Sequence, residues 1–251
     1  MAESLKVLTY NIHKGFCTGN RRFVLKGMRE LLEIVDADIV FLQEVHGSTS
    51  RHKRKRGSFP DTPHFEYLAE QIWPHFAYGK NAIYKKGDHG NAILSKYPFE
   101  FVENINVARS RLASRSILHG VLEIPEKNFK LHTLCIHLGL FESERMEQVE
   151  VLVDRIESHV PHDEPMVIAG DFNDWRGRIE KLLGDALDTK ELFMELDGHH
   201  AATFPIWFPM LPMDRIFYRG LKPLAGRCLS KGPWRSLSDH AALLGIFELP
   251  E

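Results

Sequence analysis

Short apolar runs rich in β-branched residues recur along the chain and alternate with segments that mix apolar and charged residues. The runs cover residues 7–10, 38–42, 91–94, 116–118, 131–136 and 166–169. Runs that are this evenly apolar are typical of strands covered on both faces. The pattern predicts two further strands late in the chain, over 214–218 and 241–247.

Two of the segments between these runs carry apolar residues at helical spacing. One predicted helical face consists of Phe23, Met28, Leu31, Leu32 and Val35. The other predicted face consists of Met146, Val149, Leu152, Val153, Ile156 and Val160. Pro161 ends this second helix, because proline cannot continue a helix. The pattern therefore predicts an α/β fold in which helices cover sheets.

Polar side chains gather where the predicted strands end. The residues that follow an apolar run in this way are Asn11, Glu44, His137, Asp171 and Asn173. In α/β sheets, functional groups cluster at the carboxyl ends of strands, because the loops there carry chemistry while the sheet fixes their position. The sequence therefore predicts one site assembled from at least four distant segments.

Three further residues, Asp214, Asp239 and His240, extend this set to several carboxylates, two amides and two imidazoles. Oxygen ligands without thiolates suit a hard cation such as Mg²⁺, with Mn²⁺ as a substitute, and such ions complete their shell with water and phosphate oxygens. No segment resembles the zinc-binding pattern HExxH. We therefore expect a magnesium-type site.

Composition narrows the possible classes of protein further. The chain has 251 residues, of which 43% are hydrophobic and 26% charged, and it contains no Gly/Ser-rich or Pro-rich linker, so one domain over 1–251 is expected. The 32 Lys and Arg residues nearly balance the 34 Asp and Glu residues, which excludes a global positive field for nucleic acid. A local basic run, Arg51 to Arg56, is either a solvated loop or a weak contact for nucleic acid or an anionic membrane.

The first residues lack a basic region followed by an apolar run, and no stretch reaches the ~18 apolar residues of a membrane span. Cys17, Cys135 and Cys228 form neither a disulfide framework nor a CxxC zinc pattern. A cytoplasmic location with reduced cysteines is therefore expected, and no stable partner is predicted.

Seven motifs occur in order between about residues 5 and 248. They are Tyr10-Asn11-Ile12-His13, Leu42-Gln43-Glu44, Gly90-Asn91-Ala92-Ile93-Leu94-Ser95, His137-Leu138-Gly139, Gly170-Asp171-Phe172-Asn173, Asp214-Arg215-Ile216-Phe217 and Ser238-Asp239-His240. The series resembles the endonuclease/exonuclease/phosphatase (DNase I-like) superfamily, and in particular its bacterial members with a first motif Asn-Ile-His-Lys-Gly. The resemblance implies a four-layered sandwich of two mixed β-sheets flanked by helices.

The resemblance also implies roles for individual residues. Glu44, Asn11 and Asp239 would bind the metal, while Asp171 and Asn173 would orient the attacking water and hold the phosphate. His240 would act as general base or as a stabiliser of phosphate charge, oriented by Asp214, and His137 would donate to a phosphate oxygen. Arg115 and Asn91 are the further phosphate-binding candidates. One position departs from the exonuclease III-like pattern, because His13 stands where those members have aspartate.

Alternatives remain at two places. Asp214 either supports His240 or forms a surface salt bridge with Arg215. The apolar segment 203–213 is either a loop packed on the core or a hydrophobic rim that holds a lipid tail or stacks on a base.

The predicted function is a Mg²⁺-dependent phosphoester hydrolase, specifically a phosphodiesterase, that acts on a lipid head group, a nucleic acid or a small phosphodiester. A DNA or RNA nuclease and a catalytically silent phosphate-binding module are the alternatives.

Overall fold

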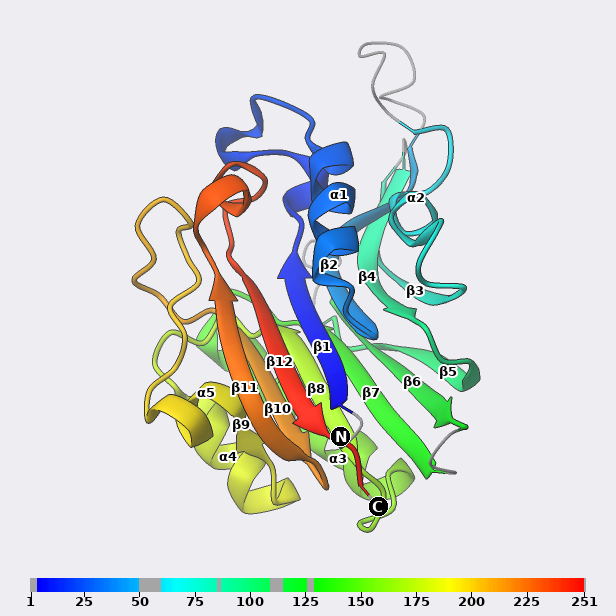
Figure 1. Cartoon of the computed structure of the whole chain (residues 1–251). Coiled ribbons are helices and arrows are strands. Elements are labelled where there is room, and N and C mark those ends of the chain that lie inside the picture. The colour runs from blue at the N-terminus through cyan, green and yellow to red at the C-terminus, as the bar shows by residue number, and fades with distance from the viewer. Residues whose placement is uncertain (1–3, 50–59, 85–86, 109–114, 126–128, 251) are drawn as a thin grey trace.

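A computed structural model describes residues 4–49, 60–84, 87–108, 115–125 and 129–250. Its strands form two mixed six-stranded sheets, shown in Figure 1. In spatial order, the first sheet comprises β11 (Lys222–Leu229), β12 (Ala242–Glu248), β1 (Ser4–Asn11), β2 (Ile39–Thr49), β4 (Gly87–Ser95) and β3 (His75–Tyr84). The second comprises β5 (Phe99–Asn106), β6 (Ser116–Ile124), β7 (Phe129–His137), β8 (Met166–Asp171), β10 (Asp214–Arg219) and β9 (Lys190–Glu191).

Helices cover the outer faces of the two sheets, except for the short α5 (Leu192–Asp197), whose Leu192 and Phe193 belong to the core between the sheets. The described α-helices are α1 (Leu25–Val35), α2 (His64–Ala69), α3 (Glu142–His159), α4 (Arg178–Leu187) and α5 (Leu192–Asp197). Buried residues of α1 and α2 share an apolar cluster with the first sheet, and those of α3 and α4 share one with the second. None of the helices in the described ranges is long and apolar enough to cross a bilayer.

The main core lies between the sheets. Val7 and Phe41 of the first sheet pack in one cluster with Cys135 and Val167 of the second. The layers are therefore helices, sheet, sheet, helices, which confirms the predicted four-layered α/β sandwich.

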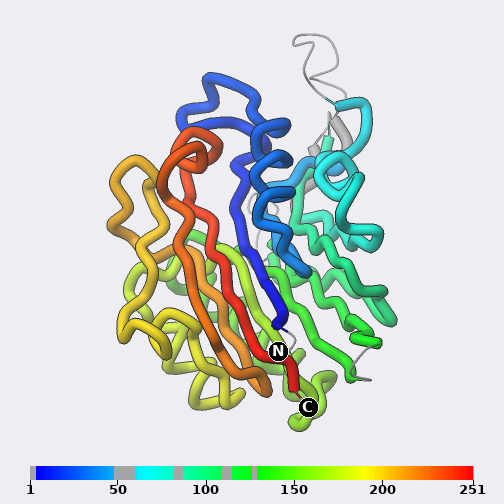
Figure 2. Tube along the Cα trace, viewed as in Figure 1, coloured from blue at the N-terminus to red at the C-terminus, as the bar shows by residue number. Residues whose placement is uncertain are grey.

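Strand directions bring the predicted site residues to one edge. β1 runs parallel to β2, and β7 runs parallel to β8, so their carboxyl ends meet there. β12 is antiparallel to β1, and β10 is antiparallel to β8, so these two strands begin at the same edge. Figure 2 shows both chain termini at the opposite, lower end of the molecule.

One site position differs from the strand-end prediction. β2 does not end before Glu44 but continues through a register irregularity between Leu42 and Val45, where Glu44 has φ 57°. A bulge aims a side chain out of a continuing strand, so Glu44 reaches the site from within β2. Asn91 lies inside β4, in the run that the sequence predicts as a strand.

Candidate active site

Asp171 is the centre of the site. It ends β8 and is buried, and it is the register partner of His137 on β7 and of Asp214 on β10. Directly opposed residues of adjacent strands point to the same face of a sheet, with their Cβ atoms about 5 Å apart. The sheet register alone therefore places these three side chains together.

The Asp171 carboxylate is held by two amides and faces two imidazoles. Asn11 Nδ2 donates to Oδ2 at 3.0 Å, and the backbone N–H of Asn173 donates to Oδ1 at 3.0 Å. His137 Nε2 lies 3.5 Å and His240 Nε2 3.8 Å from Oδ2. Burial and the nearby Asp214 raise the pKa of Asp171 to about 7, although His240 and the amides oppose this.

His240 forms a buried pair with Asp214. Its Nδ1 lies 2.8 Å from Asp214 Oδ2, and both side chains are almost fully enclosed. Burial alone would lower the pKa of the imidazole, but Asp214 and Asp171 outweigh it and raise the pKa to about 10. The imidazole is therefore protonated at neutral pH, and a hydrogen bond to Asp214 fixes its orientation.

The alternative predicted for Asp214, a surface salt bridge with Arg215, is not observed. Arg215 follows Asp214 on β10 and points to the other face of the sheet, where its guanidinium donates to the backbone oxygens of Pro212 and Asp174. The alternation of side chains along a strand explains why neighbours in sequence serve different faces.

His137 carries the opposite protonation state. Its imidazole is buried and lies near the positive charge of Arg115, and both effects hold its pKa well below the usual range despite Glu44. A neutral imidazole has one N–H donor, and a nearby phosphate oxygen is a suitable acceptor. The two site histidines are thus distinguished by their surroundings.

Glu44 and Asp239 face the site from the first sheet. Lys14 Nζ lies 3.4 Å from Glu44 Oε2, and His13 Nδ1 lies 3.5 Å from Asp239 Oδ1. Burial raises the pKa of Glu44, but the interactions with His137, Lys14 and His13 outweigh it and lower the pKa to about 2. Glu44 is therefore ionised over the whole physiological range.

These residues fit a hard cation. Glu44 Oε2 is buried, and Lys14 Nζ at 3.4 Å is the cation that faces it. A buried, ionised carboxylate of this kind is a suitable ligand for a metal ion. Asp239 adds a second carboxylate, and Asn11 Oδ1 adds an amide oxygen that also accepts the backbone N–H of His13 at 3.1 Å. The donor set contains only oxygen, as Mg²⁺ and Mn²⁺ prefer.

Asp171, Asp214 and His240 also bring one ligand atom each to within 4.8 Å of one another. We do not interpret this group as the metal site. The Asp214–His240 hydrogen bond occupies Nδ1, and a protonated imidazole repels a cation. The group is better suited to holding and transferring protons.

The predicted phosphate contacts separate into two kinds. Asn173 Nδ2 and Arg115 Nε both donate to the backbone oxygen of Leu138, at 2.9 and 3.2 Å, which places both residues beside His137. Asn91 Nδ2 instead donates to the backbone oxygens of Ser116 and Cys135, at 2.9 and 3.3 Å. These bonds to the second sheet use both amide hydrogens, so we do not carry a phosphate contact of Asn91 into the proposal.

Two site residues received no role from the sequence. Ser238 Oγ donates to the backbone oxygen of Asn11 at 2.7 Å and accepts the backbone N–H of His240 at 3.3 Å, and so joins the end of β1 to the His240 loop. Lys14 faces Glu44. Both belong to motifs that the sequence shows, Ser-Asp-His and Asn-Ile-His-Lys-Gly, and this is the signal that could have identified them.

The two-sheet sandwich carries a buried Asp–His pair beside hard oxygen donors at one edge, an arrangement suited to the hydrolysis of a phosphoester. The family model described as "Endonuclease/Exonuclease/phosphatase family" matches residues 8–240. The chain therefore belongs to this family, whose members hydrolyse phosphoesters.

Known proteins resemble the chain in sequence and in fold. It is 43% identical to the uncharacterized protein YbhP of Escherichia coli (strain K12) over 240 residues, which cover 96% of this chain and 94% of that protein. An endonuclease/exonuclease/phosphatase from Beutenbergia cavernae superposes with a TM-score of 0.77 at 18% identity, over 98% of this chain and 72% of the other. D. rerio TDP2, crystallised with a single-strand DNA product, superposes with a TM-score of 0.74 at 19% identity, over 98% of this chain and 100% of that chain.

Proposed function

We propose that this protein is a phosphodiesterase that requires a divalent metal ion, Mg²⁺ with Mn²⁺ as a substitute. The observation that carries the proposal is the position of the Asp171 carboxylate, which Asn11 and Asn173 hold within 3.8 Å of a neutral and a protonated imidazole. This arrangement places a proton acceptor, a hydrogen-bond donor and a positive charge around one point. In-line attack of water on phosphorus needs these three groups.

Glu44, Asp239 and Asn11 would hold the ion. When bound there, it supplies positive charge and Lewis acidity to the phosphate oxygens. Glu44 is the principal ligand in this proposal, because its carboxylate is buried and ionised.

The remaining residues bind the phosphate and move protons. Asp171, with a pKa of about 7, accepts the proton of the attacking water. The His240 imidazolium, held by Asp214, stabilises the negative charge that grows on the phosphoryl oxygens, so the high pKa favours charge stabilisation over a general-base role. His137 donates its N–H to a phosphate oxygen. Asn173 and Arg115 position the ester from the side of Leu138.

The site offers charges of both signs to a substrate. The carboxylates of Glu44, Asp171, Asp214 and Asp239 are accompanied by the cations of Lys14, Arg115 and His240. A diester carries one negative charge, whereas a phosphate monoester carries close to two at neutral pH. The relative rates with the two esters therefore decide between a phosphodiesterase and a phosphatase.

Some features of the proposal concern the whole chain. We propose that residues 1–251 act as one catalytic domain, which is supported by the core that both sheets share. The cytoplasmic location and the absence of a stable partner stay predictions. The basic run Arg51 to Arg56 lies outside the described residues.

A nuclease is the second candidate. Trp175 lies four residues after Asp171 and its side chain is 42% exposed, next to the exposed Arg176. An exposed ring beside a cation suits the stacking of a base and contact with its phosphate. D. rerio TDP2 has the same fold and was crystallised with single-strand DNA, and this likeness supports the candidate at the level of the fold.

Hydrolysis of bis(p-nitrophenyl) phosphate and of p-nitrophenyl phosphate tests the proposal, with Mg²⁺, Mn²⁺ or EDTA. We expect turnover of the diester that requires metal and is lost in Glu44→Gln and His240→Ala. Preference for the monoester would indicate a phosphatase instead. Cleavage of an oligonucleotide would assign the nuclease, and metal binding without any turnover would revive the silent phosphate-binding module.

A further inference from the structure

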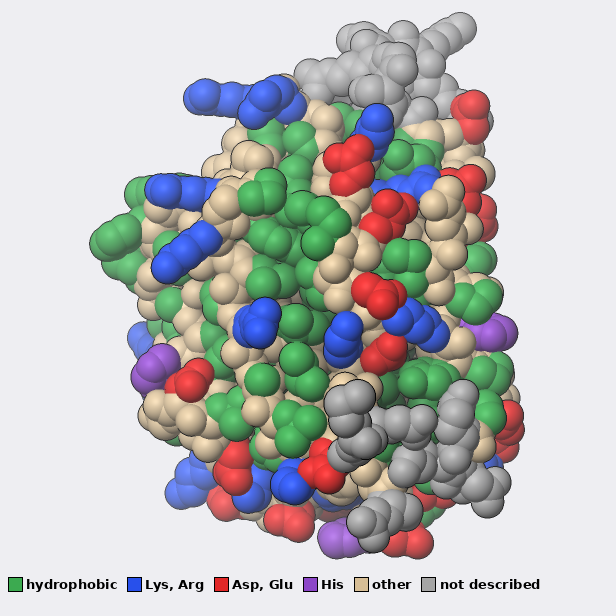
Figure 3. All heavy atoms as spheres, viewed as in Figure 1, with side chains coloured by type: hydrophobic (Ala, Val, Ile, Leu, Met, Phe, Trp, Pro, Cys, Tyr) green, Lys and Arg blue, Asp and Glu red, His purple; other side chains and the backbone are tan. Residues whose placement is uncertain are grey.

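The loop between α5 and β10 presents apolar side chains to solvent. Thr203 and Ile206 are buried, so part of the loop packs on the core, but Trp207, Phe208 and Met210 are 58%, 58% and 59% exposed. Figure 3 shows apolar side chains protruding at the left edge of the molecule, where Figure 1 places this loop, with Lys and Arg side chains beside them. We call Trp207, Phe208 and Met210 the apolar tip.

The apolar tip is fixed relative to the active site. The backbone N–H of Ile206 donates to the oxygen of Asp239 at 2.7 Å, and that of Ala241 donates to the oxygen of Thr203 at 2.9 Å. The Phe204 ring lies 4.9 Å from the His240 ring. The base of the loop is therefore anchored beside His240, and the apolar tip extends from this base.

One neighbouring connection is joined to this loop by a hydrogen bond, and a second connection is joined to the first. Arg235, between β11 and β12, donates to the backbone oxygen of Trp207 at 2.8 Å. Thr18, between β1 and α1, donates to the backbone oxygen of Ser238 at 3.1 Å. Figures 1 and 2 show the three connections together at the upper left of the molecule.

The charge of these three connections, residues 12–24, 198–213 and 230–241, is mainly positive. Their basic residues are Lys14, Arg21, Arg22, Lys231 and Arg235, and their single acidic residue is Asp239 of the site. Except for Lys14, these basic residues are exposed, so the apolar tip belongs to a face with an excess of exposed cations.

We propose that this face docks on an anionic lipid bilayer, with the apolar tip entering the head-group region and Arg21, Arg22 and Lys231 contacting lipid phosphates. Exposed Trp and Phe beside Lys and Arg are the composition of interfacial membrane anchors. A nucleic acid fits less well, because the Trp207 and Phe208 rings stack on each other, 6.4 Å apart at 27°, and Met210 offers no ring face to a base.

Docking in this orientation would present lipid phosphodiesters to Asp171 and His240. This consequence rests on the proposed function and names a phospholipid head group as its substrate class. Docking itself requires no turnover.

Co-sedimentation with vesicles tests the docking. The vesicles contain phosphatidylcholine alone, or phosphatidylcholine and phosphatidylglycerol at about 7:3. We expect the wild type to bind the anionic vesicles. Trp207→Ser/Phe208→Ser should weaken binding about tenfold or more. Arg21→Gln/Arg22→Gln should weaken it about twenty-five-fold, since one cation near such a surface contributes about fivefold.

Matched controls separate docking from general surface effects. Ile34→Ser removes a side chain that is 77% exposed on α1, and Lys181→Gln/Lys190→Gln removes two exposed charges near α4. Both should bind like the wild type. Quenching of Trp207 fluorescence by lipids brominated near the head group, absent in Trp207→Phe, would locate the apolar tip in the bilayer.

The results distinguish the proposals. Unchanged vesicle binding by Trp207→Ser/Phe208→Ser, or equal binding to neutral and anionic vesicles, overturns docking. Binding of a single-stranded oligonucleotide that the same variants lose, without vesicle binding, assigns the face to nucleic acid. Vesicle binding by the wild type and by Glu44→Gln without hydrolysis of any phosphodiester leaves docking standing and removes the proposed function. Hydrolysis of a soluble diester without vesicle binding overturns docking and leaves the proposed function standing.

Discussion

Asp171 and Asp214 are direct cross-strand partners on β8 and β10, and the His240 imidazole faces both carboxylates. Its Nδ1 lies 2.8 Å from Asp214, and its Nε2 lies 3.8 Å from Asp171. The two carboxylates hold the imidazole in its charged form, because each lowers the free energy of the cation. The register of two antiparallel strands thus sets the protonation state of a residue from a third segment.

Replacement of Asp214 tests this relationship. Asp214→Asn keeps the shape of the side chain but removes the charge that orients and protonates His240. We expect kcat for the diester to fall by about 10² to 10⁴, with a small change in KM, because the lost interaction acts in the transition state. Steady-state kinetics measures both values. Asp185→Asn, an exposed carboxyl on α4, is the matched control, and equal effects of the two variants would refute the role of Asp214.

Glu44 governs the affinity for metal in the proposed site. Glu44→Gln replaces the ionised carboxylate by a neutral amide of the same size, so we expect Mn²⁺ binding to weaken by at least about tenfold. Calorimetric titration of the isolated protein measures this without reference to activity. Glu30→Gln, which changes an exposed carboxyl on α1, should bind Mn²⁺ like the wild type. Undiminished affinity in Glu44→Gln would exclude Glu44 as the principal ligand.

Much of this site could be predicted from the sequence, for a physical reason. Strands that are covered on both faces are evenly apolar, so the polar residues that end them, such as Asn11, His137 and Asp171, stand out. Once β1 and β8 are recognised, their carboxyl ends fix one edge of the sandwich. The helices beneath each sheet follow from apolar spacing, as α1 and α3 show.

Other features depend on contacts that a linear pattern does not contain. Glu44 lies within β2, because a register irregularity against β4 aims it into the site. Asn91 has the residue type of a phosphate ligand, yet its position inside β4 turns its amide toward the second sheet. The edge strands β5 and β11 were not predicted, since their exposed or half-buried residues lack the apolar runs of central strands.

A polar chain on the outer face of the second sheet predicts how stability depends on pH. Arg155 Nε donates to His119 Nδ1 at 3.3 Å, so the other His119 nitrogen carries the proton that faces His132 Nδ1 at 3.0 Å, and His132 Nε2 faces Glu164 at 2.6 Å. Both imidazoles are therefore neutral. Burial, His132 and Arg155 lower the pKa of His119 to about 3.

The direction of the pH dependence of stability follows from this depressed pKa. Below the ordinary histidine pKa of about 6.5, His119 binds a proton in the unfolded chain but stays neutral in the folded one. The contribution of His119 to stability is therefore complete above that pH and is lost as the pH falls toward about 3. The loss approaches about 1.4 kcal/mol per pH unit. Urea unfolding at pH 7.5 and at pH 5 should show a smaller difference for His119→Gln than for the wild type. The same pH dependence in both proteins would contradict a neutral, buried His119.

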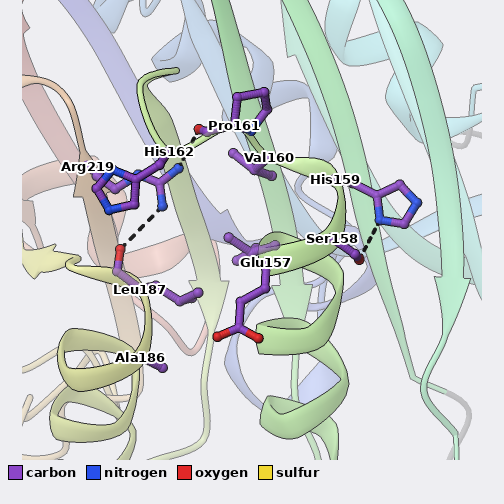
Figure 4. A pocket seen from close by; sticks show the side chains of 10 residues that line it. Glu157, Ser158, His159, Val160, Pro161, His162, Ala186, Leu187 and Arg219 are labelled. Carbon is purple, nitrogen blue, oxygen red and sulfur yellow. Dashed lines mark hydrogen bonds between the residues drawn. The ribbon is translucent and has the colours of Figure 1, made fainter.

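Arg219 joins two helix ends, and its removal should destabilise the fold. Its guanidinium donates to the backbone oxygens of Pro161, just beyond α3, at 2.9 Å and of Leu187, at the end of α4, at 3.4 Å, as Figure 4 shows. Helix C-terminal carbonyls favour a cation. We expect Arg219→Gln to lower the free energy of unfolding by about 2 kcal/mol, because buried hydrogen bonds from a charged donor are lost. In urea unfolding, Arg176→Gln, which removes an exposed cation paired with Glu142, should change stability by less than about 0.5 kcal/mol. Equal, small effects of both variants would show that the two helix ends do not depend on Arg219.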